Sequence, residues 1–174
     1  MADYEKQYRE SRHVCGPPFP EFVTFFERYD KTRARVLDLG CGQGRDALPI
    51  ARMGHQVLGV DISRTGVSQM LKEAEQEGLD VHSVVADVVE YQPSGQFDVI
   101  ILDRVLHMLS DDDDRLAVLE KASAATAQGG YVLIADTPKH QPLIRSFFSE
   151  QPDGWTKVKD RKGFIFVQKP CVSR

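Results

Sequence analysis

Residues 36–63 read VLDLGCGQGRDALPIARMGHQVLGVDIS, and their pattern is the strongest indication of the fold. A short apolar run, Arg35–Leu39, leads into three closely spaced glycines and a helical segment that ends near Met53, where Gly54 supplies a stop. A second apolar run, Gln56–Val60, follows at once. Both runs are nearly continuous rather than alternating, which is typical of parallel strands covered on both faces. The stretch therefore predicts a strand, a helix and a second, parallel strand.

The same alternation continues along the chain. Three further apolar runs of the same kind are expected to be strands covered on both faces: Val81–Ala86, Phe97–Leu102 and Tyr131–Ala135. Two longer segments between the runs are expected to be helices. Ser63 caps the first, which runs to about Glu77 and stops at Gly78; Ser110 caps the second, which Gly129 and Gly130 end. Strands that alternate with helices predict a doubly wound parallel sheet with right-handed crossovers.

The last part of the chain has a different pattern. Gln141–Glu150 is expected to be a helix, followed by two strands, Trp155–Asp160 and Gly163–Lys169, joined by Arg161–Lys162. So short a connection requires antiparallel strands. The predicted fold class is therefore α/β, with one doubly wound seven-stranded sheet whose last strand pair is antiparallel.

The N-terminal segment, residues 1–32, is expected to form two helices, Tyr4–Arg12 and Glu21–Tyr29, around a Gly-Pro-Pro break at 16–18. At 174 residues the chain has the length of one domain. We therefore expect a single domain, 1–174, in which residues 33–174 form the core.

Composition excludes several classes of function. The net charge of −4 predicts no basic face for nucleic acid or for an anionic membrane. No apolar run approaches the roughly 20 residues of a membrane span. Three cysteines without a CxxC pair indicate reduced thiols rather than disulfides or a zinc site, so we expect a cytoplasmic protein without a metal.

Acidic residues recur where the first five predicted strands end. They are Asp38, Asp61, Asp87, Asp103 and Asp136. Ligands of open α/β sheets bind at the carboxyl ends of the strands, and aspartate is unfavourable within strands, so a shared role in binding is one interpretation. The other is that each aspartate starts a turn or caps the helix that follows. The sequence leaves both open.

The glycine-rich segment Asp38-Leu39-Gly40-Cys41-Gly42-Gln43-Gly44 narrows the ligand. A dinucleotide-binding loop of the GxGxxG type needs a third glycine at position 45, which is Arg45. Asp38 would also repel a pyrophosphate but suits a cationic group. Asp61, at the end of the second strand, fits a carboxylate that accepts bonds from ribose hydroxyls. Together they predict a nucleoside ligand that carries a positive group and no phosphate.

On these residues the sequence resembles class I S-adenosylmethionine-dependent methyltransferases: residues 36–63 look like motifs I and II of that superfamily. The resemblance follows the strand order from about residue 33 to 169. Within the superfamily the chain is most similar to the small tellurite-resistance and thiopurine-type methyltransferases, through residues 51–57 (ARMGHQV) and the lack of an inserted substrate domain.

The resemblance implies a role for each matching residue. Gly40, Gly42 and Gly44, with Cys41 inside the loop, surround the methionine and ribose portions of S-adenosylmethionine. Asp38 lies near the methionine ammonium, directly or through water, and Asp61 accepts the ribose hydroxyls. Ile62, Asp87 and Val88 contact the adenine, while Asp103 and Arg104 border the methionine end and the methyl acceptor.

Methyl transfer from a sulfonium mainly requires alignment of donor and acceptor. A thiolate, selenide or tellurium acceptor needs no general base, whereas a hydroxyl or ammonium acceptor does. His107 is the first candidate for that base and Asp103 the second; a locally satisfied histidine is the alternative. The N-terminal segment is expected to close over the cofactor with Tyr4, Tyr8 and Arg12, although an i,i+4 packing pair of tyrosines is equally compatible.

We therefore expect an enzyme that methylates a small molecule, as a monomer or homodimer, with no nucleic-acid or membrane partner. Its acceptor is not readable from the sequence. A non-catalytic S-adenosylmethionine-binding protein is the main alternative. An RNA methyltransferase is disfavoured by the acidic balance, and a nicotinamide dehydrogenase by Arg45.

Overall fold

The computed structural model describes residues 4–152 and 154–171 of the chain. It divides into two compact units, Met1–Val88 and Val89–Arg174, which are described in turn. Among the residues that the model describes, no helix has both the length and the apolar character needed to cross a membrane.

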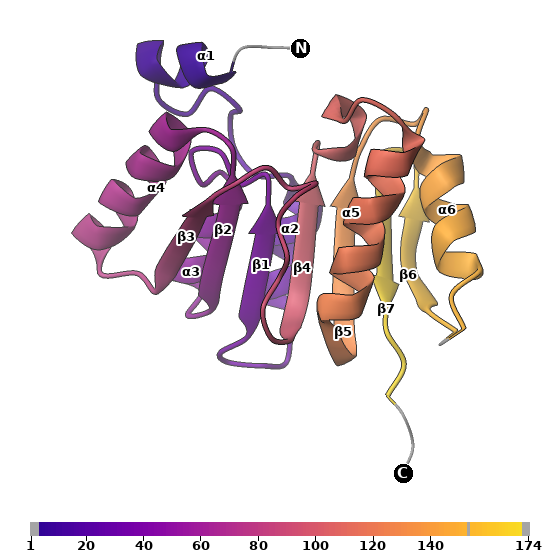
Figure 1. Cartoon of the computed structure of the whole chain (residues 1–174). Helices are drawn as coiled ribbons and strands as arrows, with labels where there is room; N and C mark the ends of the chain where they lie inside the picture. Colours follow the sequence, from indigo (N-terminus) through magenta and orange to yellow (C-terminus); the bar gives the residue numbers. More distant parts are fainter. Residues whose placement is uncertain (1–3, 153, 172–174) are drawn as a thin grey trace. The chain divides into compact units, whose positions relative to one another are not determined.

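The first unit contains three parallel strands with helices around them (Figure 1). Its elements are α1 (Tyr4–Glu10), α2 (Pro20–Glu27), β1 (Arg35–Leu39), α3 (Ala47–Arg52), β2 (Gln56–Asp61), α4 (Arg64–Glu77) and β3 (Val81–Val85). β2 lies between β1 and β3, with Val57 paired to both Val36 and Val81. The predicted strand–helix–strand unit is thus confirmed, with its carboxyl ends at one edge.

Local signals explain where α4 begins and ends. The Ser63 hydroxyl accepts a hydrogen bond from the backbone N–H of Gly66 at 3.0 Å, which satisfies a free donor of the first turn. Gly78 ends the helix with a φ of 65°, a left-handed conformation that glycine adopts at little cost. Both predictions are confirmed.

The second unit is built on β4 (Phe97–Asp103) and β5 (Thr126–Ala135), which are parallel. Its other elements are the 3₁₀ turn η1 (Leu106–Met108), α5 (Asp112–Ala125), α6 (Gln141–Ser149), β6 (Thr156–Arg161) and β7 (Phe164–Gln168). β7 pairs antiparallel with both β5 and β6, which gives the order β4-β5-β7-β6. The antiparallel last pair is therefore confirmed.

Two predictions about α5 were wrong. Its N-cap is Asp111 rather than Ser110, because the Asp111 carboxylate accepts the backbone N–H of Asp114 at 3.0 Å. The helix also ends at Ala125, and Gly129 and Gly130 lie within β5 instead of stopping the helix. The strand passes close to its neighbour there: a Cβ at Gly130 would lie 2.8 Å from the Asp98 carbonyl oxygen.

The prediction that every strand is covered on both faces was also wrong for β3. Only Val81 of this strand is buried, whereas Val84 and Val85 are 37% and 40% exposed. Within the first unit β3 pairs with β2 alone, so its other edge has no strand to cover it. A continuous apolar run therefore does not by itself identify an interior strand.

Candidate functional site

The glycine-rich segment forms a tight turn between β1 and α3. The backbone N–H groups of Gly40 and Cys41 both donate to the Val60 carbonyl oxygen, at 2.7 and 3.1 Å. The turn is thereby fixed against the end of β2. Gly40, Gly42 and Gly44 have φ values of 82°, 51° and 84°, so the predicted need for glycine in this turn is confirmed. The helix that is expected to follow the three glycines starts at Ala47, after this turn.

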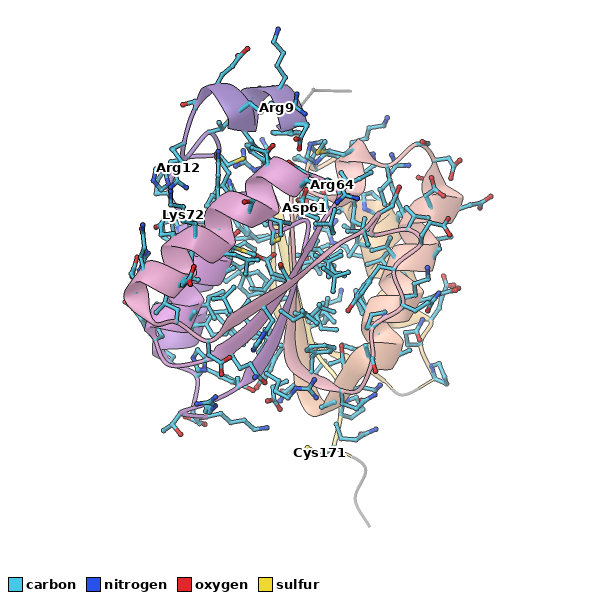
Figure 2. The ribbon with its side chains drawn as sticks, turned by 60° about the vertical axis from the view of Figure 1, so that its left-hand side comes forward. Arg9, Arg12, Asp61, Arg64, Lys72 and Cys171 are labelled. Atoms are coloured by element: carbon cyan, nitrogen blue, oxygen red, sulfur yellow. The ribbon has the colours of Figure 1, made fainter. Side chains whose placement is uncertain are left out.

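Asp61 is held by the same turn. One carboxylate oxygen accepts the backbone N–H of Gly42 and the other accepts that of Ser63, each at 2.8 Å. Burial raises the pKa of Asp61, although these two N–H bonds oppose the rise. These N–H groups fix the carboxylate in place without using all of its roughly four acceptor sites, so it can still accept hydroxyl groups. Figure 2 shows Asp61 beside the start of α4, which Arg64 marks.

Asp38 lies inside β1 and is 2% exposed. One of its carboxylate oxygens is buried and has no hydrogen-bond partner in the part of the chain that the structure describes. Burial, reinforced by the nearby Asp46 carboxylate, holds the pKa of Asp38 well above its usual range. A buried acceptor of this kind is costly in the free protein. A bound cationic donor would remove that cost.

Asp38→Asn is therefore expected to stabilise the ligand-free protein. A pKa that is raised in the folded state means that stability is lost as the pH rises above the pKa of an unfolded aspartate, about 3.9. Asparagine cannot ionise, so the variant should exceed the wild type by about 1 kcal/mol or more at neutral pH. Urea unfolding at low and neutral pH measures this, with the exposed Asp30→Asn as control. A difference that is largest at low pH would contradict the expectation.

The N-terminal helix is bonded to this site. The Glu5 carboxylate accepts hydrogen bonds from the hydroxyls of Ser63 and Thr65 at the start of α4, and these bonds lower the pKa of Glu5 to about 2. The Gln69 side chain donates to the Tyr8 carbonyl oxygen at 2.8 Å. α1 thus lies beside the N-terminal end of α4, as Figure 1 shows.

The three N-terminal candidates have different surroundings. Tyr8 is 5% exposed and packs on the glycine turn, because a Cβ at Gly42 would lie 2.5 Å from its hydroxyl oxygen. The Tyr4 ring lies 5.7 Å from the Tyr8 ring, so the tyrosines do form an i,i+4 pair. Arg12 is exposed and donates to the Gln69 carbonyl oxygen at 3.4 Å. A role for the three in closing over a cofactor stays a prediction.

The residues expected to contact adenine follow β2 and β3, which are neighbours in register. Ile62 is 70% exposed, more than any other exposed large apolar side chain among the residues that the structure describes. Asp87 is exposed and Val88 half-buried, just beyond the end of β3. The free apolar surface of Ile62 is compatible with the predicted stacking of a base.

In the second unit, Asp103 ends β4 and is 7% exposed. The Arg104 guanidinium Nε lies 3.9 Å from an Asp103 carboxylate oxygen. Arg104 has a φ of 55°, which is uncommon for a residue other than glycine, and its N–H donates to the Ala135 carbonyl oxygen at 2.7 Å. Strained backbone of this kind gathers at functional sites.

Sequence reasoning missed the role of Asp136, which follows β5 directly. One oxygen of its buried carboxylate accepts the backbone N–H of His107 at 3.1 Å and lies 3.4 Å from Nδ1 of the His107 ring. The other oxygen accepts the backbone N–H of Thr137 at 2.7 Å and lies 3.2 Å from Nδ1 of His140. The spacing of Asp136 and His140 was the only local signal, and it pointed to no partner for His107.

The structure thus gathers the predicted residues into two groups. In the first unit the glycine turn, Asp38, Asp61 and Tyr8 come together. In the second unit His107 lies against Asp136, while Asp103 pairs in register with Ala135, the residue before Asp136. Among the described residues no group of histidine, cysteine and acidic side chains has the arrangement of a metal site.

Comparison with known proteins shows the family to which the chain belongs. Residues 36–130 match a family model described as a methyltransferase domain. A ubiquinone biosynthesis O-methyltransferase of Rhodopseudomonas palustris (strain BisB18) is 32% identical over 101 residues, which are 58% of this chain and 39% of the relative. A relative of the same name from Caulobacter sp. (strain K31) is 30% identical over 135 residues, 71% of this chain and 52% of the relative. The chain thus spans about half or less of each relative.

Solved structures share the fold over nearly the whole chain. TehB from Haemophilus influenzae superposes with a TM-score of 0.76 at 16% identity. The superposition covers 96% of this chain and 67% of the TehB chain. The N-methyltransferase NodS from Bradyrhizobium japonicum WM9, in complex with S-adenosylhomocysteine, gives a TM-score of 0.77 at 12% identity, with 97% and 100% covered. These likenesses confirm the expected fold class, a doubly wound seven-stranded sheet with an antiparallel last pair.

Proposed function

The chain belongs to the methyltransferase-domain family, and from this premise we propose that it transfers the methyl group of S-adenosylmethionine to a small-molecule acceptor. The observation that carries the proposal is the Asp61 carboxylate, fixed by the N–H groups of Gly42 and Ser63 beside the glycine turn. A carboxylate so held can accept both hydroxyls of a ribose. The buried, unpartnered oxygen of Asp38 supplies an acceptor for the methionine ammonium.

Each part of the ligand then has a residue of this chain to hold it. Asp61 binds the ribose, Asp38 the ammonium, and Ile62 with Asp87 and Val88 the adenine; the turn at Gly40–Gly44 lets the backbone come close. S-adenosylmethionine supplies the activated methyl group when it is bound. The protein's own work is to orient the two reactants and to keep water out, and Tyr8 and Arg12 on the N-terminal segment serve that second task.

The names of the relatives support a small acceptor, because both act in ubiquinone biosynthesis as O-methyltransferases. The same cofactor-binding geometry would also serve a non-catalytic S-adenosylmethionine-binding protein, and only turnover separates the two. We place the protein in the cytoplasm, because three cysteines without a CxxC pair fit the thiols of a reducing compartment.

Calorimetric titration with S-adenosylmethionine and S-adenosylhomocysteine tests the cofactor. The expected result is a dissociation constant on the order of micromolar for both ligands, which corresponds to a binding free energy of about −8 kcal/mol. NADH is the control and should give no heat of binding. NADH should not bind, because Asp38 would repel its pyrophosphate and Arg45 stands where a dinucleotide-binding loop needs its third glycine. A folded sample that binds neither adenosyl ligand would overturn the proposed function.

A further inference from the structure

Asp136 contacts two histidines that differ in their exposure to solvent. The Asp136 side chain is 1% exposed, and its two oxygens face Nδ1 of His107 and Nδ1 of His140, respectively. The His140 side chain is 9% exposed, whereas that of His107 is 29% exposed. One carboxylate therefore orients one buried imidazole and one that reaches the surface.

The hydrogen-bond chemistry fixes the tautomer of the partly exposed His107 ring. An ionised carboxylate only accepts hydrogen bonds, so the proton of neutral His107 lies on Nδ1, toward Asp136. The lone pair is then on Nε2, for which the described residues offer no hydrogen-bond partner. The backbone N–H of His107 donates to the same carboxylate oxygen, so main chain and ring are fixed together.

This pair stands at the edge where an open α/β sheet binds its ligands. Asp136 follows the last residue of β5, and His107 belongs to η1, just after β4. Asp103 and Ala135 are paired at the ends of these two parallel strands, so both connections leave the same edge of the second unit. A helix cap or a turn needs no partly exposed imidazole held by a buried carboxylate.

We propose that Asp136 positions His107 as the general base that takes the proton of a hydroxyl acceptor. The inference rests on the proposed methyl transfer and adds the class of acceptor to it. A carboxylate that accepts the Nδ1–H of an imidazole holds the ring in one tautomer and leaves Nε2 available to abstract a proton. Asp136 is here a positioning residue, and His107 is the catalytic one.

The path of the proton during methyl transfer explains why the acceptor is a hydroxyl. The acceptor oxygen forms a bond to the methyl carbon, the carbon–sulfur bond breaks with its electron pair going to sulfur, and the hydroxyl proton goes to Nε2 of His107. The imidazolium so formed is stabilised by Asp136 and returns its proton to water. A thiolate has already lost its proton at neutral pH to a useful extent, and a positioned base adds little to its reaction.

The tautomer of His107 can be measured without any acceptor. Long-range ¹⁵N–¹H NMR of the histidine rings should show protonated Nδ1 and bare Nε2 for His107 in the neutral form, with His107→Gln assigning the signal. In Asp136→Asn this bias should be lost, because an amide both donates and accepts. His140→Gln is the matched control, since it removes the other ring from the same carboxylate. A proton on Nε2 of wild-type His107, or an unchanged tautomer in Asp136→Asn, would overturn the inference.

Turnover tests the acceptor class with 4-methylphenol, catechol and 4-methylthiophenol as probes. His107→Gln and Asp136→Asn should lower kcat for the phenols by about 100-fold or more, with KM little changed. Transfer to the thiol should stay within about threefold of the wild type. Equal losses for both acceptor types, or a wild type that binds S-adenosylmethionine but methylates no phenol, would refute the inference. A wild type that binds no S-adenosylmethionine would instead refute the proposed function.

Discussion

Asp61→Ala is expected to weaken S-adenosylhomocysteine binding by about 100-fold or more. A hydrogen bond to a charged group contributes about 1.5–3 kcal/mol, so losing two from the ribose costs at least about 3 kcal/mol, which is roughly two factors of ten. The variant also leaves the N–H groups of Gly42 and Ser63 without their acceptor. Because those bonds fix the glycine turn, the remaining contacts to the ligand should weaken as well.

The control for this variant is Asp80→Ala. Asp80 is also an acidic residue of the first unit, but its carboxylate binds Arg33 and His82 near the start of β3. It should leave the affinity for S-adenosylhomocysteine unchanged in the same calorimetric titration. If Asp61→Ala bound as tightly as the wild type while both variants remained folded, the ribose site would not be at Asp61.

The second large effect is expected from Gly44→Ala, on the stability of the protein. Gly44 has a φ of 84°, and a Cβ there would lie 2.6 Å from Cγ of Met70 and 2.9 Å from Cγ of Leu48. The left-handed backbone costs a side-chain-bearing residue about 1–2 kcal/mol, and overpacking a filled core costs about 1–3 kcal/mol more. Met70 is fully buried, so it has little room to move aside.

Gly16→Ala separates the two contributions. Gly16 also has a positive φ, 71°, but a Cβ there would meet no atom within 4 Å. It should therefore show the backbone cost alone, about 1–2 kcal/mol, and Gly44→Ala should exceed it clearly in urea unfolding at neutral pH. Equal losses in the two variants would mean that the space around Gly44 adjusts, and that conformation alone requires glycine in the turn.

Those parts of the fold and site that depend on neighbouring residues could be predicted from the sequence. The glycine turn needs positive φ at fixed spacings, and Ser63 and Gly78 mark the ends of α4 by their own backbone chemistry. The position of Asp61 beside the glycine turn follows from its place at the end of β2. Each of these features is settled within one turn or one strand, where a short pattern has few alternatives.

The features that the sequence did not predict join distant segments. His107 and Asp136 are 29 residues apart, and Glu5 and Ser63 are 58 apart. No pattern along the chain indicates which two loops will meet at the end of a sheet or which carboxylate will reach a helix start. The exposure of β3 has the same cause, because being an edge strand depends on its partners and not on its own residues.

Because the Glu5 carboxylate is hydrogen-bonded to the start of α4, we expect the N-terminal helix and α4 to unfold together. Ser63 uses one hydroxyl twice: it accepts the N–H of Gly66 to start the helix, and it donates to Glu5. Detaching the N-terminal helix therefore removes a partner from the first turn of α4, and fraying of that turn releases the N-terminal helix in return. We therefore expect the two to open as one cooperative unit, with amides that exchange with solvent at a common rate. Since Asp61 accepts the backbone N–H of Ser63, the ribose site proposed at Asp61 would belong to the segment whose order depends on residues far upstream.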